Sequence, residues 1–171
     1  MEKHNYLQTA RLVLKPLEEK DRESMIHMAE DGQIKKTYMF QDFADRAQKD
    51  AFYDRLLALC ASEKRVIFGI YLQDRLIGML NETETDGESI ELGYFIDSEY
   101  WNHGYASEAL TAAIDELFQR GFKRVCAGYF EGNEASRRVM EKSGMKLTDK
   151  EAVINYRGVD HRCLFCEIVR E

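Results

Sequence analysis

The chain has few of the residues that divide a protein into separate parts. Its 171 residues include only one proline, Pro16, and no serine- and glycine-rich linker. It contains no internal repeat and no low-complexity run. A chain of this length, with 44% hydrophobic residues, can bury a sizeable core and is not expected to be disordered. We therefore expect a single domain over residues 1–171.

The chain also lacks an excess of positive charge and any long apolar run. Its formal net charge is -7, which argues against nucleic acid as the main partner because nucleic-acid-binding proteins usually present a basic face. No apolar run approaches the length of a membrane span, and Met1–Tyr6 has no apolar signal-peptide core. We expect no membrane partner and a cytoplasmic location.

Cysteine is scarce, with only Cys60, Cys126, Cys163 and Cys166. In a cytosolic chain we expect these thiols to be reduced. Cys163 and Cys166 form a CxxC pair near His161, which is typical of half a metal site or a redox pair. No second ligand pair is visible, and residues three apart on a strand point to opposite faces. We therefore favour core packing for both cysteines and expect no metal.

The hydrophobic periodicity predicts the element order β-αα-βββ-α-β-α-ββ, in a mixed sheet with helices on both faces. This is an α/β (α+β) fold. It does not suit a doubly wound dinucleotide-binding fold, because three consecutive strands precede the third helix and no GxGxxG motif is present. The expected strands are residues 12–14, 66–72, 75–83, 91–96, 124–129, 145–152 and 162–169; the helices are residues 18–30, 47–62, 105–120 and 133–143; residues 82–88 are expected to be a loop or hairpin tip.

The segment from Tyr100 to Leu110 is the most informative part of the chain. It lies between a strand-like run and a helix-like run, and the small residues Gly104, Ala106 and Ser107 fall where the helix begins. The start of a helix has unpaired backbone N–H groups and a positive dipole end. Small side chains let a phosphate approach these groups. The segment therefore predicts a pyrophosphate-binding site.

Four segments, in this order and at these spacings, resemble the GNAT superfamily of acetyl-CoA-dependent N-acetyltransferases. The similarity covers nearly the whole chain and is greatest to the branch that includes ribosomal-protein-alanine acetyltransferases. Trp101 stands where the superfamily's phosphate loop usually has Gln or Arg, although this branch commonly has Trp there. Asn102 stands where the branch often has Gly. The segments that carry the resemblance are Thr9–Leu14, Glu91–Tyr94, Tyr100–Leu110 and Gly132–Met145.

The resemblance implies a mainly antiparallel central sheet and acetyl-CoA as co-substrate, without a metal. The pantetheine arm would pair with backbone groups in the strand after Glu91, and the pyrophosphate would bind N–H groups of the phosphate loop. The cofactor-binding residues implied are Tyr94, Phe95, Ile96, Asn102, His103, Gly104, Tyr105, Ala106, Ser107 and Asn133. His103 is also interpretable as a solvent-facing loop residue, and Asn133 as a simple helix cap.

Acetyl transfer to a mostly protonated amine needs a group that accepts the amine proton. Glu91 is the first candidate, because strand alternation puts it on the same face as Gly93 and Phe95. A solvated or ion-paired carboxylate is the alternative interpretation. By resemblance, Ser136 lies where the family places the donor of a hydrogen bond to the departing thiolate, and its O–H can donate. Helix capping is the alternative for Ser136.

We therefore expect an N-acetyltransferase that transfers the acetyl group to a primary amine by direct attack in a ternary complex. The acceptor could be a protein N-terminus, a polyamine or another small amine. An acetyl-cysteine route through Cys126 is disfavoured because a buried strand cysteine is usually inert. The alternative outside enzymology is a non-catalytic acyl-CoA-binding sensor or interaction module. The resemblance also makes a homodimer through the final strand plausible.

Overall fold

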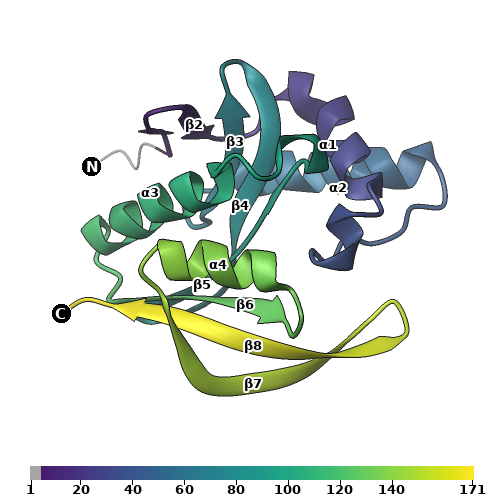
Figure 1. The fold of residues 1–171 in the computed structure, drawn as a ribbon. Coiled ribbons are helices and arrows are strands. Elements are labelled where there is room, and N and C mark those ends of the chain that lie inside the picture. Colours follow the sequence, from purple (N-terminus) through teal and green to yellow (C-terminus); the bar gives the residue numbers. More distant parts are fainter. Residues whose placement is uncertain (1–4) are drawn as a thin grey trace. The chain divides into compact units, whose positions relative to one another are not determined.

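The computed structural model describes residues 5–171 (Figure 1). Residues 1–4 lie outside the described residues. They make up most of the N-terminal segment in which we expected no signal-peptide core. No helix within the described part of the chain is both long and apolar enough to cross a membrane. The strands are β1 (Leu7–Gln8), β2 (Leu12–Lys15), β3 (Ile67–Leu72), β4 (Arg75–Asp86), β5 (Ser89–Ile96), β6 (Arg124–Phe130), β7 (Lys146–Tyr156) and β8 (Val159–Val169); the α-helices are α1 (Arg22–Glu30), α2 (Arg46–Cys60), α3 (Tyr105–Gln119) and α4 (Glu134–Lys142).

Hydrogen bonds link the strands in the order β1-β2-β3-β4-β5-β6-β8-β7. The recorded pairings are antiparallel, except that β5 and β6 run parallel. The parallel pairing covers four residue pairs, from Ser89 with Arg124 to Leu92 with Ala127, although both strands continue beyond it. This mixed, mainly antiparallel sheet confirms the predicted fold class.

Several elements differ from the prediction; β7, for example, ends at Tyr156 rather than at residue 152, and β8 begins at Val159 rather than at residue 162. The two-residue strand β1 was missed because it is too short to show alternation. The first helix begins at Arg22 rather than at residue 18, because Glu18 and Asp21 form a capping box around a 3-10 turn, η1 (Glu19–Asp21). The segment 82–88, predicted to be a loop or hairpin tip, contains the tip only at residues 87–88. β4 runs to Asp86, since Thr83 and Thr85 alternate with the acidic residues and β-branched side chains favour strands.

The contacts within the chain group it into two compact units, of which the first comprises residues 1–81 and 94–105. Here α1 and α2 contribute apolar side chains to one core with the strands. Phe95 at the end of β5 belongs to this core. The helix and strand residues that share it include Met25, Met28, Tyr53, Ile67, Tyr71, Leu76 and Met79.

The second unit comprises residues 82–93 and 106–171. In this unit α4 packs against β6 and β8 (Figure 1). Met140 is the buried residue of α4. A smaller apolar cluster gathers Phe130, Cys163 and Phe165 from β6 and β8. Side chains of β7 cover that cluster, namely Ala152, Ile154 and Tyr156.

A buried hydrogen bond in the first unit predicts loss of stability in alkali. The Tyr71 hydroxyl donates to Asp21 Oδ2 at 2.6 Å, and burial, followed by this carboxylate, raises the pKa of Tyr71. The pKa of a tyrosine in an unfolded chain is about 10. The contribution of Tyr71 to the free energy of unfolding is therefore complete below about pH 10. Above it, that free energy falls by up to about 1.4 kcal/mol per pH unit for this one group.

Urea unfolding between pH 8 and 11 measures this slope. We expect Tyr71→Phe to reduce the slope, whereas Tyr6→Phe, at a tyrosine that is 54% exposed, leaves it unchanged. An alkaline slope in Tyr71→Phe equal to that of the wild type would contradict the assignment.

Candidate functional site

The loop before α3 has an exposed backbone in an unusual conformation. Residues 101–104 are exposed, and α3 begins directly after them at Tyr105. Asn102 and Gly104 both have positive φ, at 64° and 79°. Asparagine is among the few side chains that tolerate this region, which explains how it replaces the glycine common in the branch. Backbone N–H groups in a turn of this kind, placed at the start of a long helix, form an anion-binding concavity.

Trp101 links this loop to the end of β5. Its indole Nε1–H donates to the Ile96 carbonyl at 2.7 Å, and the ring is 40% exposed. The departure from Gln or Arg at this position therefore has a structural role, which the sequence pattern did not reveal. His103 is exposed, and its ring lies 5.6 Å from that of Tyr105.

The backbone N–H and C=O groups of successive β5 residues point alternately to the two sides of the strand. The N–H of Asp97 donates to Ile77 of β4, and a Cβ built on Gly78 of β4 would lie 2.3 Å from the Phe95 carbonyl oxygen. The polar backbone groups of Phe95 thus face β4. Those of Tyr94 and Ile96 face the other side, since these groups alternate along a strand. An added ligand would therefore pair with Tyr94 and with the N–H of Ile96, since the Ile96 carbonyl already accepts the Trp101 indole.

An aromatic cluster packs around Phe95. Tyr38 and Phe40 contact the Phe95 ring at centroid distances of 4.7 and 5.0 Å. The Tyr38 hydroxyl donates to Asn81 Oδ1 at 2.8 Å, and burial raises the pKa of this tyrosine. Phe40 is buried, whereas Met39 is 51% exposed. The packing of Tyr38 and Phe40 fixes the α1–α2 connection against β5.

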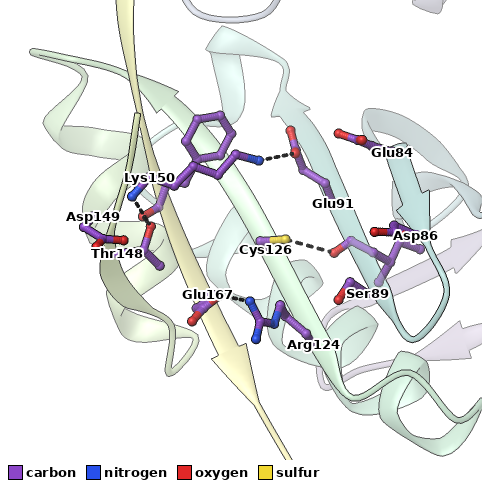
Figure 2. A pocket seen from close by; sticks show the side chains of 12 residues that line it. Glu84, Asp86, Ser89, Glu91, Arg124, Cys126, Thr148, Asp149, Lys150 and Glu167 are labelled. Atoms are coloured by element: carbon purple, nitrogen blue, oxygen red, sulfur yellow. Dashed lines mark hydrogen bonds and ion pairs between the residues drawn. The ribbon is translucent and has the colours of Figure 1, made fainter. Parts of the chain in front are cut away.

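Glu91 lies in a pocket of about 300 Å³ in the second unit (Figure 2). Its carboxylate is 19% exposed and pairs with Lys150 Nζ at 3.8 Å. The Lys150 ammonium lies 4.3 Å from the centroid of the Phe165 ring. Glu91 thus forms an ion pair, and its role as the proton acceptor stays a prediction. Lys150 was missed because nothing in the sequence pairs residues 59 positions apart. The pocket is lined by Glu84, Asp86, Ser89, Ile90, Glu91, Arg124, Cys126, Thr148, Asp149, Lys150, Phe165 and Glu167.

Cys126 lies beside Glu91 in the parallel strand pair and lines the same pocket. Burial, followed by the Glu91 carboxylate, raises the pKa of the thiol. Only the thiolate is an effective nucleophile, so this environment disfavours an acetyl-cysteine route. Cys163 and Cys166 are both buried on β8, where burial raises their pKa values. Both pack as core residues, and the described residues contain no cluster of potential metal ligands.

Asn133 and Ser136 form the start of α4. The Asn133 side-chain oxygen accepts the backbone N–H of Ser136 at 3.3 Å, which confirms the predicted cap. Both side chains are partly exposed. The cap uses the carboxamide oxygen of Asn133, so a ligand contact of this residue would come from its NH₂ group.

The chain belongs to the acetyltransferase (GNAT) domain family, which matches residues 11–146. It is therefore an acetyltransferase of mixed α/β fold, as the resemblance predicted.

Individual relatives agree with this assignment. The chain is 28% identical over 153 residues to the uncharacterized N-acetyltransferase YoaA of Bacillus subtilis, covering 86% of this chain and 85% of that protein. A GNAT-family acetyltransferase structure from Bacillus anthracis superposes with a TM-score of 0.82 at 24% identity, covering 96% and 98% of the two chains. RimL, a ribosomal L7/L12 α-N-protein acetyltransferase in complex with coenzyme A, has a TM-score of 0.79 at 14% identity, covering 96% and 97%.

Proposed function

We propose that the protein is an acetyl-CoA-dependent N-acetyltransferase that acts on a primary amine by direct attack in a ternary complex. The observation that carries the proposal is the exposed loop of residues 101–104, with positive φ at Asn102 and Gly104 at the start of a 15-residue helix. This arrangement fits a pyrophosphate. The coenzyme A complex of RimL, whose fold this chain shares, supports the same donor.

The residues proposed to hold acetyl-CoA fall into two groups. Tyr94 and the N–H of Ile96 lie on the side of β5 that faces away from β4, where the pantetheine pairs with them in the manner of an added strand. We propose that Asn133 contacts the pantetheine through its NH₂ group. Phe95 does not pair with the ligand, and its side chain packs in the core of the first unit. The backbone of the loop and the first turn of α3 binds the pyrophosphate, through Asn102, His103, Gly104, Tyr105, Ala106 and Ser107.

Two side chains of the second unit are proposed for the chemistry. Glu91 accepts the proton of the attacking amine, directly or through a water, because its partly exposed carboxylate lines the pocket of the second unit. Ser136 donates a hydrogen bond from its hydroxyl to the departing CoA thiolate. Direct attack needs no protein nucleophile, in agreement with the raised pKa of Cys126.

Gly104→Val is expected to weaken acetyl-CoA binding about tenfold. A branched side chain in the left-handed region costs roughly 1–2 kcal/mol, so the binding conformation of the loop becomes a minor population. Gly158→Val is the matched control, because Gly158 has the same φ of 79° in the turn between β7 and β8. Isothermal titration calorimetry should show weaker binding only for Gly104→Val; equal affinities in the two variants would argue against the phosphate site.

The proposed reaction is tested by measuring CoA release from acetyl-CoA with a panel of amines. The panel contains peptides with free and blocked N-termini, a polyamine and small monoamines. Turnover with any unblocked amine, and an acetylated product by mass spectrometry, would support the proposal. Tight acetyl-CoA binding without turnover on any amine would favour the alternative, a non-catalytic acyl-CoA sensor.

A further inference from the structure

Arg11 is held in a tight turn that joins β1 to β2. The N–H of Thr9 donates to the Leu12 carbonyl at 2.9 Å, and the N–H of Leu12 donates to Thr9 Oγ1 at 2.9 Å. These two bonds close the turn on both sides of residues 10 and 11 and fix the backbone from which the Arg11 side chain extends. The turn belongs to a segment that carries the family resemblance, yet no part of the proposed reaction uses it.

The Arg11 guanidinium contacts the loop before α3, in the same compact unit. Its Nη1 donates to the His103 carbonyl oxygen at 2.9 Å, and its carbon lies 4.6 Å from the centroid of the Tyr105 ring. A Cβ built on Gly104 would lie 3.4 Å from Arg11 Nη2. One guanidinium thus contacts His103 and Tyr105 and lies close beside Gly104 between them.

The bond to His103 fixes the direction of a neighbouring N–H. The carbonyl of His103 and the N–H of Gly104 belong to one planar trans peptide, in which the two groups point in opposite directions. A charged donor that holds the carbonyl on the Arg11 side therefore turns the Gly104 N–H to the other side. It also keeps a partial negative charge on the oxygen away from an anion bound there.

We propose that Arg11 is a positioning residue for the pyrophosphate of acetyl-CoA, acting by orienting the peptide between His103 and Gly104. This inference rests on the proposed function, since it presumes that the loop binds the donor's pyrophosphate. Arg11 acts through the loop backbone rather than on the reacting atoms. Its removal therefore changes donor affinity and leaves the maximal rate of acetyl transfer unchanged.

The first experiment measures affinity by calorimetry in Arg11→Gln and Arg11→Lys. Arg75→Gln is the matched control, because Arg75 is an exposed cation 5.5 Å from the Tyr100 ring, in the same unit. We expect Arg11→Gln to weaken both acetyl-CoA and dephospho-CoA about tenfold. Binding of S-acetylpantetheine, which lacks the pyrophosphate, should be unchanged. Arg11→Lys should recover most of the affinity, because it keeps the charge and one donor, and Arg75→Gln should bind like the wild type.

The second experiment needs no donor. In the ligand-free protein, the amide NMR signal of Gly104 should shift in Arg11→Gln and stay in place in Arg75→Gln. Thermal unfolding of each variant checks that the fold is intact.

Three results would overturn the inference. An Arg11→Gln variant that binds acetyl-CoA within twofold of the wild type would exclude the positioning role and leave the proposed function standing. An equal loss with S-acetylpantetheine would assign Arg11 to the fold instead. A wild-type protein that does not bind acetyl-CoA would overturn the proposed function and this inference together.

Discussion

Gly78→Ala is expected to destabilise the protein by about 4 kcal/mol, a value at the upper end of single-residue effects. The added Cβ would lie 2.3 Å from the carbonyl oxygen of Phe95 and 3.2 Å from the Cα of Ile96. Both are backbone atoms of β5, so relief requires β4 and β5 to move apart and lose ladder hydrogen bonds. The folded-to-unfolded ratio should fall about a thousandfold. Urea unfolding at pH 7 measures the change.

The control for Gly78→Ala is Gly32→Ala, because no atom lies within 4 Å of a Cβ built on Gly32. We expect this variant to match the wild type within about 0.5 kcal/mol. A Gly78→Ala protein of wild-type stability would show that β4 and β5 adjust freely at this point. The result bears on function as well, since the displaced segment of β5 contains the backbone groups proposed to pair with pantetheine.

Glu91→Gln is expected to lower kcat about 100-fold, a typical contribution of a general base. Glutamine keeps the size of the side chain and its hydrogen-bonding capacity but cannot take the amine proton. The affinity for acetyl-CoA should not change, because Glu91 is not among the groups proposed to hold the donor. Steady-state kinetics at saturating amine, together with calorimetry, separates the two effects.

Two variants separate catalysis by Glu91 from its ion pair. Glu84→Gln removes the charge of another carboxylate that lines the same pocket, and we expect its kcat to stay within about threefold of the wild type. Lys150→Met breaks the pair with Glu91 but leaves the carboxylate in place, so it should retain most of the activity. If Lys150→Met loses as much activity as Glu91→Gln, the ion pair is what matters and Glu91 is not the base.

The parts of the fold that the sequence predicted correctly are those determined by neighbouring residues. The start of α4 follows from Asn133, whose side chain caps the helix, and its end follows from Gly144, which lies just beyond it. The start of α3 was predicted because small residues lie next to the first residues of its helical pattern. Burial of Cys163 and Cys166 followed from strand alternation and apolar neighbours.

The parts that the sequence did not predict depend on residues distant in the chain. The ion pair of Glu91 with Lys150 and the bond of Arg11 to His103 join residues 59 and 92 positions apart. Both require the register of several strands to be known first. The acidic end of β4 was missed for a related reason: its polar composition suggested a loop, whereas pairing with β5 makes it a strand. The roles proposed for Glu91 and Ser136 stay predictions.

The position of β7 has a consequence for aggregation. Because β7 ends the strand order, one of its hydrogen-bonding edges has no neighbouring strand within residues 5–171. Its register with β8 shifts between Leu147 and Glu151, a stretch that also carries two further charges, and irregular, charged edges resist the addition of another strand. Residues 152–156 pair regularly with β8, and Val153 among them is 71% exposed. An added strand would therefore pair with this edge at these five residues more readily than at the irregular stretch before them.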